Sequence, residues 1–188
     1  MIFYLHGFNS SPHSHKAQVL GRYLAERGLA TRYACPALPP LGSAAIRLVE
    51  RNLPEGPVCF VGSSLGGFYA TYLAEKHRAK AVLINPAIEP QAGLRAYLGP
   101  QKNLHTGEPY ELTEAHLRDW EELVVARITP ARYLLLVETG DEVLDYRQAV
   151  RRYAGCEQIV VSGGDHSLQS FPQHLARIVE FAGHAASL

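Results

Sequence analysis

The feature that most constrains the fold is the alternation of short apolar runs with longer segments of helical spacing. Six runs are expected to be strands: Ile2–Leu5, about Ala30–Cys35, Val58–Val61, Lys80–Ile84, Tyr133–Val137 and Gln158–Val161. Most are continuous rather than alternating in polarity, which is typical of a parallel sheet buried on both faces. Between the runs, apolar residues share one helical face, as Ala17, Leu20 and Leu24 do. The pattern predicts an α/β fold with a mostly parallel sheet of about six strands and helices on both faces.

Length and charge restrict the classes of function. A chain of 188 residues suits one domain with a real core, so we expect residues 1–188 to form a single domain. Equal numbers of basic and acidic residues, 18 of each, argue against a nucleic-acid partner or an anionic membrane surface. No apolar run has the length of a membrane span, and MIFYLHGF lacks the features of a signal peptide. Cys35, Cys59 and Cys156 form no CxxC pair, which indicates reduced thiols in a cytoplasmic protein.

One connection, between Ile84 and Tyr133, is too long for a simple crossover. Its second part is expected to be a helix that Thr113 caps and whose face carries Leu117, Trp120 and Val124. The preceding LGPQKNLHTGEPYEL is rich in turn residues. The insertion, about residues 86–130, is predicted to be either a lid or an extra helix packed on the sheet.

The stretch VCFVGSSLGGFYATYLAEK is a strand-to-helix turn that contains two serines. A nucleophile on such a sharp turn needs small residues two positions before and two positions after it. Gly62 and Gly66 satisfy this for Ser64, whereas the corresponding neighbours of Ser63 are a valine and a leucine. We therefore interpret Ser64 as the nucleophile. A phosphate cradle is disfavoured because no GK[ST] follows the glycines and no GxGxxG follows the first strand.

Candidate acid and base residues follow the last two predicted strands. His166 lies in the loop SGGDHSLQSF, where it can act as the base that a serine nucleophile requires. Asp141 follows Gly140 at the preceding strand end and is the favoured partner of the histidine, with Asp145 as the alternative. Asp165 is adjacent to His166, and neighbouring side chains rarely point at each other. The order Ser, Asp, His is that of the α/β-hydrolase triad.

The first predicted strand ends in His6-Gly7, a pair that is similar to the HG-type oxyanion loop of esterases. We expect His6 to have a structural role in fixing this loop. The backbone N–H groups of Phe8 and Leu65 are the expected oxyanion donors, since Leu65 follows the nucleophile and begins a helix.

Several motifs together resemble the YqiA-type esterases, small bacterial α/β hydrolases. They span nearly the whole chain and include YLHGFNSSP, PALPP, GSSLGGFYATYLAE, NPA, TGEPYEL, TGDEVLDYRQAV and GGDHS. The resemblance implies a three-layer α/β-hydrolase core that lacks the two amino-terminal strands of larger relatives. In it, a small insertion or lid lies between strands five and six of the usual core order. It also implies esterase activity on acyl esters or thioesters, with Ser64, Asp141 and His166 as triad.

The sequence thus predicts a serine esterase that acts on a small-molecule acyl ester or thioester and needs no metal or organic cofactor. His13-x-His15 has no evident third ligand for a metal. A thioesterase or peptidase with the same triad, and a non-catalytic binding module on the same fold, remain alternatives. Tyr97, Tyr110 and Trp120 are candidates for an acyl pocket, or else for core or lid packing.

Overall fold

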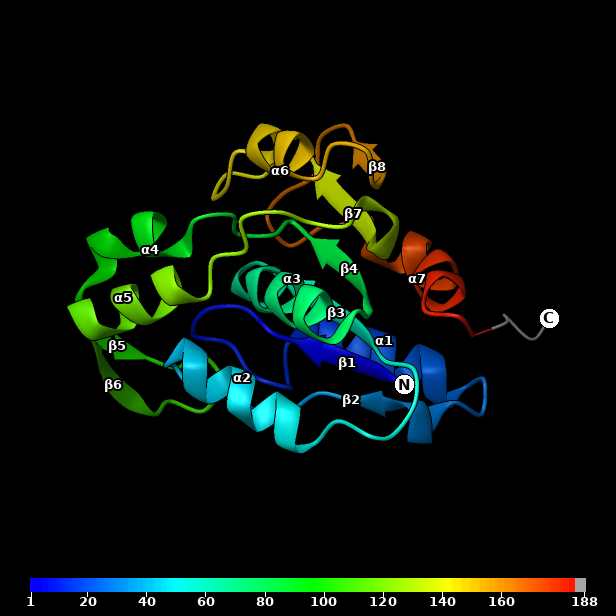
Figure 1. The fold of residues 1–188 in the computed structure, drawn as a ribbon, viewed down its shortest axis with the longest axis horizontal. Coiled ribbons are helices and arrows are strands. Elements are labelled where there is room, and N and C mark those ends of the chain that lie inside the picture. Colours follow the sequence, from blue (N-terminus) through cyan, green and yellow to red (C-terminus); the bar gives the residue numbers. More distant parts are fainter. Residues whose placement is uncertain (185–188) are drawn as a thin grey trace.

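The computed structural model describes residues 1–184 and places six parallel strands in one central sheet (Figure 1). The strand order is β2-β1-β3-β4-β7-β8, and every neighbouring pair is parallel. The strands are β1 (Ile2–Leu5), β2 (Tyr33–Ala34), β3 (Cys59–Ser63), β4 (Lys80–Ile84), β7 (Tyr133–Glu138) and β8 (Glu157–Val161). The expected parallel sheet is confirmed.

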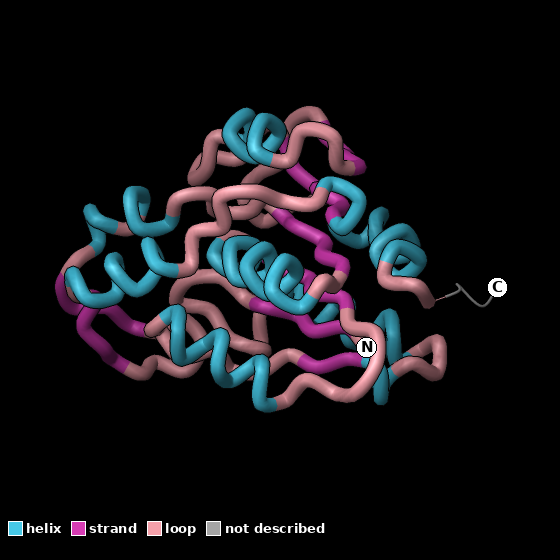
Figure 2. Tube along the Cα trace, viewed as in Figure 1, coloured by secondary structure: helices cyan, strands magenta, loops and turns pink. Residues whose placement is uncertain are grey.

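Helices cover both faces of this sheet, as Figure 2 shows. One face carries α2 (Gly42–Arg51), α3 (Leu65–His77) and α6 (Tyr146–Arg152), and the other carries α1 (His15–Ala25) and α7 (Leu175–Phe181). Successive side chains of a strand point to opposite faces. In β1, Phe3 and Leu5 accordingly join the α2–α3 core, while Ile2 and Tyr4 join the α1–α7 core. Burial on both sides explains why the strand sequence is continuously apolar.

The insertion lies between β4 and β7 and extends past the carboxyl ends of the strands, at the left of Figure 1. It consists of α4 (Pro90–Gly93), the 3₁₀ turn η2 (Arg95–Tyr97), β5 (Gly99–Lys102), β6 (Pro109–Leu112) and α5 (Glu114–Glu122). The strands β5 and β6 form a separate antiparallel hairpin. Thr113 precedes α5 as expected, and its backbone N–H donates to Nδ1 of His116 at 3.2 Å.

Two local expectations were wrong, one for the run Ala30–Cys35 and one for Val124. The run Ala30–Cys35 is mostly a 3₁₀ turn, η1 (Ala30–Arg32), followed by the two-residue edge strand β2. The turn-rich stretch before α5 also contains the β5–β6 hairpin, for which the sequence had predicted no strands. Val124 lies beyond the end of α5 and is 48% exposed, so it does not share the buried face of Leu117 and Trp120. Further short turns are η3 (Pro130–Arg132) and η4 (Phe171–His174). Within residues 1–184, no helix is both long and apolar enough to cross a membrane.

Candidate active site

A strained turn between β3 and α3 carries Ser64. Its φ of 54° and ψ of −122° are a combination that a non-glycine residue keeps only where the surrounding structure enforces it. The flanking glycines allow the turn, because a methyl group on Gly62 would overlap the carbonyl of Gly66, and one on Gly66 would overlap the carbonyl of Leu5. The neighbourhood around Ser64 is therefore as tight as the sequence predicted, and the serine is held at the carboxyl end of β3.

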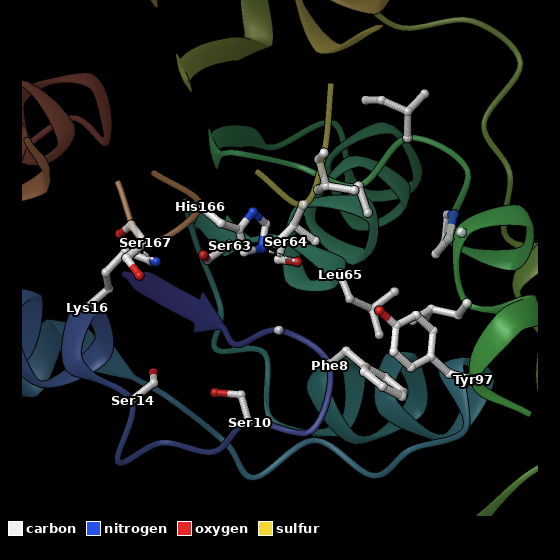
Figure 3. A pocket seen from close by; sticks show the side chains of 18 of the residues that line it. Phe8, Ser10, Ser14, Lys16, Ser63, Ser64, Leu65, Tyr97, His166 and Ser167 are labelled. Atoms are coloured by element: carbon white, nitrogen blue, oxygen red, sulfur yellow. Dashed lines mark hydrogen bonds between the residues drawn. The ribbon is translucent and has the colours of Figure 1, made fainter. Parts of the chain in front are cut away.

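The side chains of Ser64, His166 and Asp141 form a continuous chain of hydrogen bonds. His166 Nε2 lies 3.1 Å from Ser64 Oγ (Figure 3). His166 Nδ1 lies 2.8 Å from Oδ2 and 3.0 Å from Oδ1 of Asp141. The three residues follow β3, β8 and β7, and the carboxyl ends of parallel strands meet at one edge of the sheet. The fold thus brings together the three residues that the sequence indicates as the candidate triad.

The Asp141 carboxylate is almost fully shielded, with a side chain 1% exposed. Burial raises its pKa, but the hydrogen bond from His166 and those from the amides of Leu144 and Val143 outweigh this effect. The pKa of Asp141 therefore lies below its ordinary value. An ionised Asp141 accepts a hydrogen bond from the Nδ1–H group of the neutral imidazole. This bond holds the tautomer in which Nε2 carries no proton and can accept a hydrogen bond from the Ser64 hydroxyl.

The other two acidic candidates have different partners. Asp145 is the N-cap of α6, where its Oδ1 accepts the amide N–H of Arg147 at 3.0 Å. Asp165 turns away from the imidazole and accepts hydrogen bonds from two residues of its own loop. Within residues 1–184, Asp141 is the only carboxylate bonded to the His166 ring. In the same range, no three His, Cys, Asp or Glu side chains are arranged to hold a metal ion.

Two backbone amides lie beside Ser64 and are the expected oxyanion donors. The N–H groups of Phe8 and Leu65 have no acceptor within residues 1–184, and both residues line the cavity that contains Ser64. Leu65 is the first residue of α3, where backbone N–H groups have no intrahelical acceptor. Gly7 lets the loop approach the serine closely, since a Cβ there would lie 3.2 Å from Ser64 Cβ.

The buried His6 ring joins this loop to the segment after β2. Its Nε2 accepts the amide N–H of Leu38 at 3.0 Å, so the proton resides on Nδ1, which lies 3.1 Å from the Gly7 carbonyl. Burial lowers the pKa of His6, which favours the neutral ring. The contacts agree with the structural role expected for His6.

Sequence reasoning missed the residues that hold the histidine loop, and the main one is Glu138. This residue ends β7 and is only 1% exposed. Its Oε2 accepts the amide N–H groups of Asp165 and Gln169, both at 2.9 Å, and Oε1 accepts that of Ser170 at 2.8 Å. Burial raises the pKa of Glu138, but the hydrogen bonds from the loop outweigh it and hold the pKa below its ordinary value. The buried carboxylate of Glu138 thus holds the loop in place through hydrogen bonds to the backbone of the loop.

Asn85 completes this attachment from the end of β4. Its Nδ2 donates to the carbonyls of Asp165 and His166, both at 3.1 Å, and its Oδ1 accepts the amide N–H of Glu138 at 3.1 Å. Asn85 has a φ of 39°, in the left-handed region that asparagine tolerates better than most residues. A polar residue at each strand end, directly after an apolar run, is the only sequence signal that marks these two positions.

A cavity of about 880 Å³ opens at Ser64 and has two unlike sides. Figure 3 shows Phe8, Leu65 and Tyr97 on one side of Ser64 and His166, Ser14, Lys16 and Ser167 on the other, and Ser10 below them. The remaining lining residues are Tyr4, Gly7, His15, Ser63, Ala87, Ile88, Glu89, Pro90, Ala92, Gly93, Leu94, Leu104, His105, Val143, Leu144, Asp145 and Gln148. Ser64 therefore lies between an apolar wall and a polar wall.

The three aromatic pocket candidates occupy different places. Tyr97 lines the cavity and is 54% exposed. Tyr110 lines a separate cavity of about 440 Å³ behind the HG loop. Trp120 lines neither of these two cavities: it is fully buried in the core, as in the core-packing alternative, and its Nε1–H donates to the Tyr69 hydroxyl at 2.8 Å. The amphipathic spacing of α5 turns this face toward the core rather than the cavity.

The hairpin of the insertion is tied to the HG loop through Asn9. Asn9 Nδ2 donates to Gln101 Oε1 at 3.0 Å, and the Tyr110 hydroxyl donates to Asn9 Oδ1 at 2.7 Å. The amide of Leu104 donates to the Asn9 carbonyl at 2.8 Å. Part of the insertion therefore supports the loop that carries the Phe8 amide.

The parallel sheet and the residues at its strand ends define a protein with the α/β-hydrolase fold. Solved structures with this fold are similar over nearly the whole chain. Alpha/beta hydrolase domain-containing protein 10 from mouse matches with a TM-score of 0.74 and 16% identity, covering 95% of this chain and 87% of that one. The Paleococcus ferrophilus monoacylglycerol lipase matches with a TM-score of 0.70 and 16% identity, covering 98% and 94%. Est1E from Butyrivibrio proteoclasticus matches with a TM-score of 0.66 and 16% identity, covering 96% and 85%.

The family is narrower than the fold. Residues 1–183 match the Uncharacterised protein family UPF0227, the YqiA family. The chain belongs to this family, as its motifs indicated.

Proposed function

We propose that this protein is a serine esterase that hydrolyses carboxylic esters through an acyl-enzyme. The observation that carries the proposal is the hydrogen-bonded chain from Asp141 through His166 to Ser64 at the wall of a cavity. The esterases and lipases among the similar structures agree with it, although they share only the fold at this level of identity.

In the proposed reaction His166 Nε2 removes the proton from Ser64 Oγ as the oxygen attacks the ester carbonyl. Asp141 holds the imidazole in the required tautomer and stabilises its protonated form. The amides of Phe8 and Leu65 stabilise the negative carbonyl oxygen, an effect worth roughly 10²–10³ in rate for a single donor in comparable enzymes. His166 then protonates the departing alcohol, and water activated by the same residue releases the acid.

The first test is hydrolysis of p-nitrophenyl acetate, butyrate and octanoate by the protein and by Ser64→Ala. We expect Ser64→Ala to lower kcat by roughly 10⁴–10⁶-fold and to abolish labelling by a fluorophosphonate probe. Asp141→Asn is expected to lower kcat by about 10⁴-fold because it favours the wrong tautomer. Asp145→Asn is the matched control and is expected to retain activity, since this carboxylate only caps α6.

Equal rates for the parent and Ser64→Ala would contradict the serine mechanism. Absence of both hydrolysis and labelling would favour the binding-module alternative. A matched pair of an octanoyl ester and an octanoyl thioester, compared by kcat/KM, separates the esterase from the thioesterase with the same triad.

A further inference from the structure

The polar wall of the cavity lies on the side from which a leaving group departs. The general acid that protonates the leaving oxygen is His166, so the leaving group must lie next to its imidazole. In Figure 3 the groups beyond His166, away from Phe8 and Tyr97, are Ser167 and Lys16. An acyl chain then faces the apolar wall, and the alcohol or thiol portion faces Lys16.

Lys16 provides a positive charge in this wall. Its Nζ donates to the carbonyl of Ser167, the residue after the catalytic histidine, at 2.9 Å. Within residues 1–184, Lys16 forms no ion pair with a carboxylate. Burial lowers the pKa of its ammonium, while the more distant carboxylates of Asp165, Asp141 and Glu138 oppose this shift. A partly desolvated cation with a single carbonyl partner has donors left for an anion.

A second observation at the same wall is an unsatisfied hydroxyl. Ser14 Oγ is buried and has no hydrogen-bond partner within residues 1–184, although Ser14 lines the cavity. Ser14 is also the N-cap of α1, yet its side chain makes no capping bond, and the first turn of the helix contains no acidic residue. A buried polar atom without a partner is uncommon in native proteins. Here it lies two residues from Lys16, where the first amides of α1 also lack intrahelical acceptors.

The acidic residues of the cavity do not cancel this charge by direct contact. Asp145 lines the cavity but bonds the amide of Arg147 and lies 3.4 Å from its guanidinium. Glu89 also lines the cavity, but it precedes α4 in the insertion and forms no ion pair with Lys16.

We propose that the leaving-group side of the cavity is an anion subsite formed by Lys16 and Ser14, and that the substrate is an ester or thioester whose leaving group carries a phosphate or carboxylate. The ammonium and the hydroxyl donate hydrogen bonds to the anion, and the apolar wall takes the acyl chain. This inference rests on the proposed esterase function and adds the chemical class of the leaving group.

The test compares substrates that share one acyl chain. The neutral reference is para-butanoyloxybenzamide, and the anionic partners are para-butanoyloxybenzoate and para-butanoyloxyphenyl phosphate. The ratio of kcat/KM for an anionic ester to that for the neutral ester is measured at low and high salt. We expect the parent to prefer at least one anionic ester by about tenfold, equivalent to about 1.4 kcal/mol, and to lose part of the preference in high salt. The two anionic arms show whether carboxylate or phosphate fits better.

Variants then test whether Lys16 and Ser14 cause the preference for anionic esters. Lys16→Met is expected to lower the ratio to about one, Lys16→Glu to invert it, and Lys16→Arg to keep most of it. Ser14→Ala is expected to lower the ratio about two- to threefold without lowering Tm, because this hydroxyl has no partner in the free protein. Lys80→Met is the matched control: Lys80 Nζ also donates to a carbonyl, that of Phe181 at 3.0 Å, but lies at the opposite end of the strands.

The outcomes separate the two proposals. Hydrolysis that depends on Ser64 but shows no preference for either anionic ester in the parent overturns the subsite alone. A preference that persists in both Lys16→Met and Ser14→Ala also overturns it. If Lys16→Met fails to fold by circular dichroism, the ratios of the parent, Lys16→Arg and Ser14→Ala decide. Hydrolysis that does not depend on Ser64 overturns the proposed esterase instead.

Discussion

Replacing Glu138 by alanine tests whether the histidine loop is held by the carboxylate beneath it. The substitution removes the acceptor of three backbone N–H groups, those of Asp165, Gln169 and Ser170. It leaves the side chains of the proposed triad unchanged. We therefore expect Glu138→Ala to lower both stability and kcat.

The size of the effect follows from the burial of each donor. A buried N–H without an acceptor costs about 1–3 kcal/mol, and the bond from Ser170 is fully buried. The other two bonds are partly buried, so water can replace the carboxylate there at about 1 kcal/mol each. The sum is a loss of about 3–5 kcal/mol in the free energy of unfolding, which a domain of ordinary stability survives. A displacement of His166 by about 1 Å is expected to lower kcat by roughly 10–100-fold.

The assay combines urea unfolding with kcat and KM for p-nitrophenyl butyrate. Glu142→Ala is the matched control, because Glu142 also accepts an amide N–H of this loop, that of His166 at 2.9 Å, but is exposed. Its loss is expected to cost under about 1 kcal/mol. Glu138→Gln keeps one acceptor oxygen and should lie between the parent and Glu138→Ala. KM is expected to change less than about threefold, because the carboxylate positions the base and does not line the cavity.

A Glu138→Ala variant with kcat within twofold of the parent and stability within about 1 kcal/mol would refute this reasoning. A loss of stability with unchanged kcat would show that the carboxylate supports the fold without orienting the base.

Three further predictions concern the turn, the aromatic residues and pH. Gly66→Ala is expected to cost more than about 3 kcal/mol in urea unfolding, since its methyl group would overlap a carbonyl, whereas Gly93→Ala, with no atom within 4 Å of the added carbon, should be near neutral. Trp120→Phe should lose about 1–3 kcal/mol by removing a buried hydrogen bond and leave the acyl-length profile unchanged, while Tyr97→Ala should raise KM for the octanoate ester about two- to fivefold with stability within about 0.5 kcal/mol. A changed acyl-length profile for Trp120→Phe together with an unchanged KM for Tyr97→Ala would contradict the cavity described above. Because the native pKa of Glu138 is lowered, the unfolded chain binds its proton first, so this stabilisation is present above about pH 4.5 and is lost as the pH falls through the native pKa. Urea titrations from about pH 7 to pH 3 should therefore show a smaller acid-induced loss for Glu138→Ala than for the parent, and equal losses would exclude this linkage.

The central strands were predictable because burial on both faces leaves a continuous apolar signal. The extent of the edge strand β2 was not, since only Tyr33 and Ala34 of the expected run pair with β1, and the residues before them form a 3₁₀ turn. The hairpin of the insertion was missed for a related reason: Gly99, Pro100 and Pro109 are turn residues by composition, and only pairing makes the segments strands.

The residues of the candidate site also fall into those that could be predicted from the sequence and those that could not. Ser64, Asp141 and His166 could be nominated because each follows a strand and their chain order fits one chemistry. The residues that hold the histidine loop, Glu138 and Asn85, could not be predicted. They form hydrogen bonds with backbone groups that are distant in sequence and that only the folded sheet brings near. No local pattern in LLLVE reveals that its final residue, Glu138, accepts hydrogen bonds from three backbone N–H groups of the loop after β8. The face that Trp120 presents likewise depends on how α5 packs.

The attachment of the histidine loop through its backbone has a consequence for sequence variation. Glu138 and Asn85 bond the N–H and carbonyl groups of the loop, which every residue other than proline supplies. The position of His166 therefore does not depend on the identity of Ser167, which lines the polar wall of the cavity. Gly164 is an exception, because any side chain there would overlap the Glu138 carboxylate. Side chains of such a loop that face the cavity can change by substitution while the position of the His166 imidazole is kept.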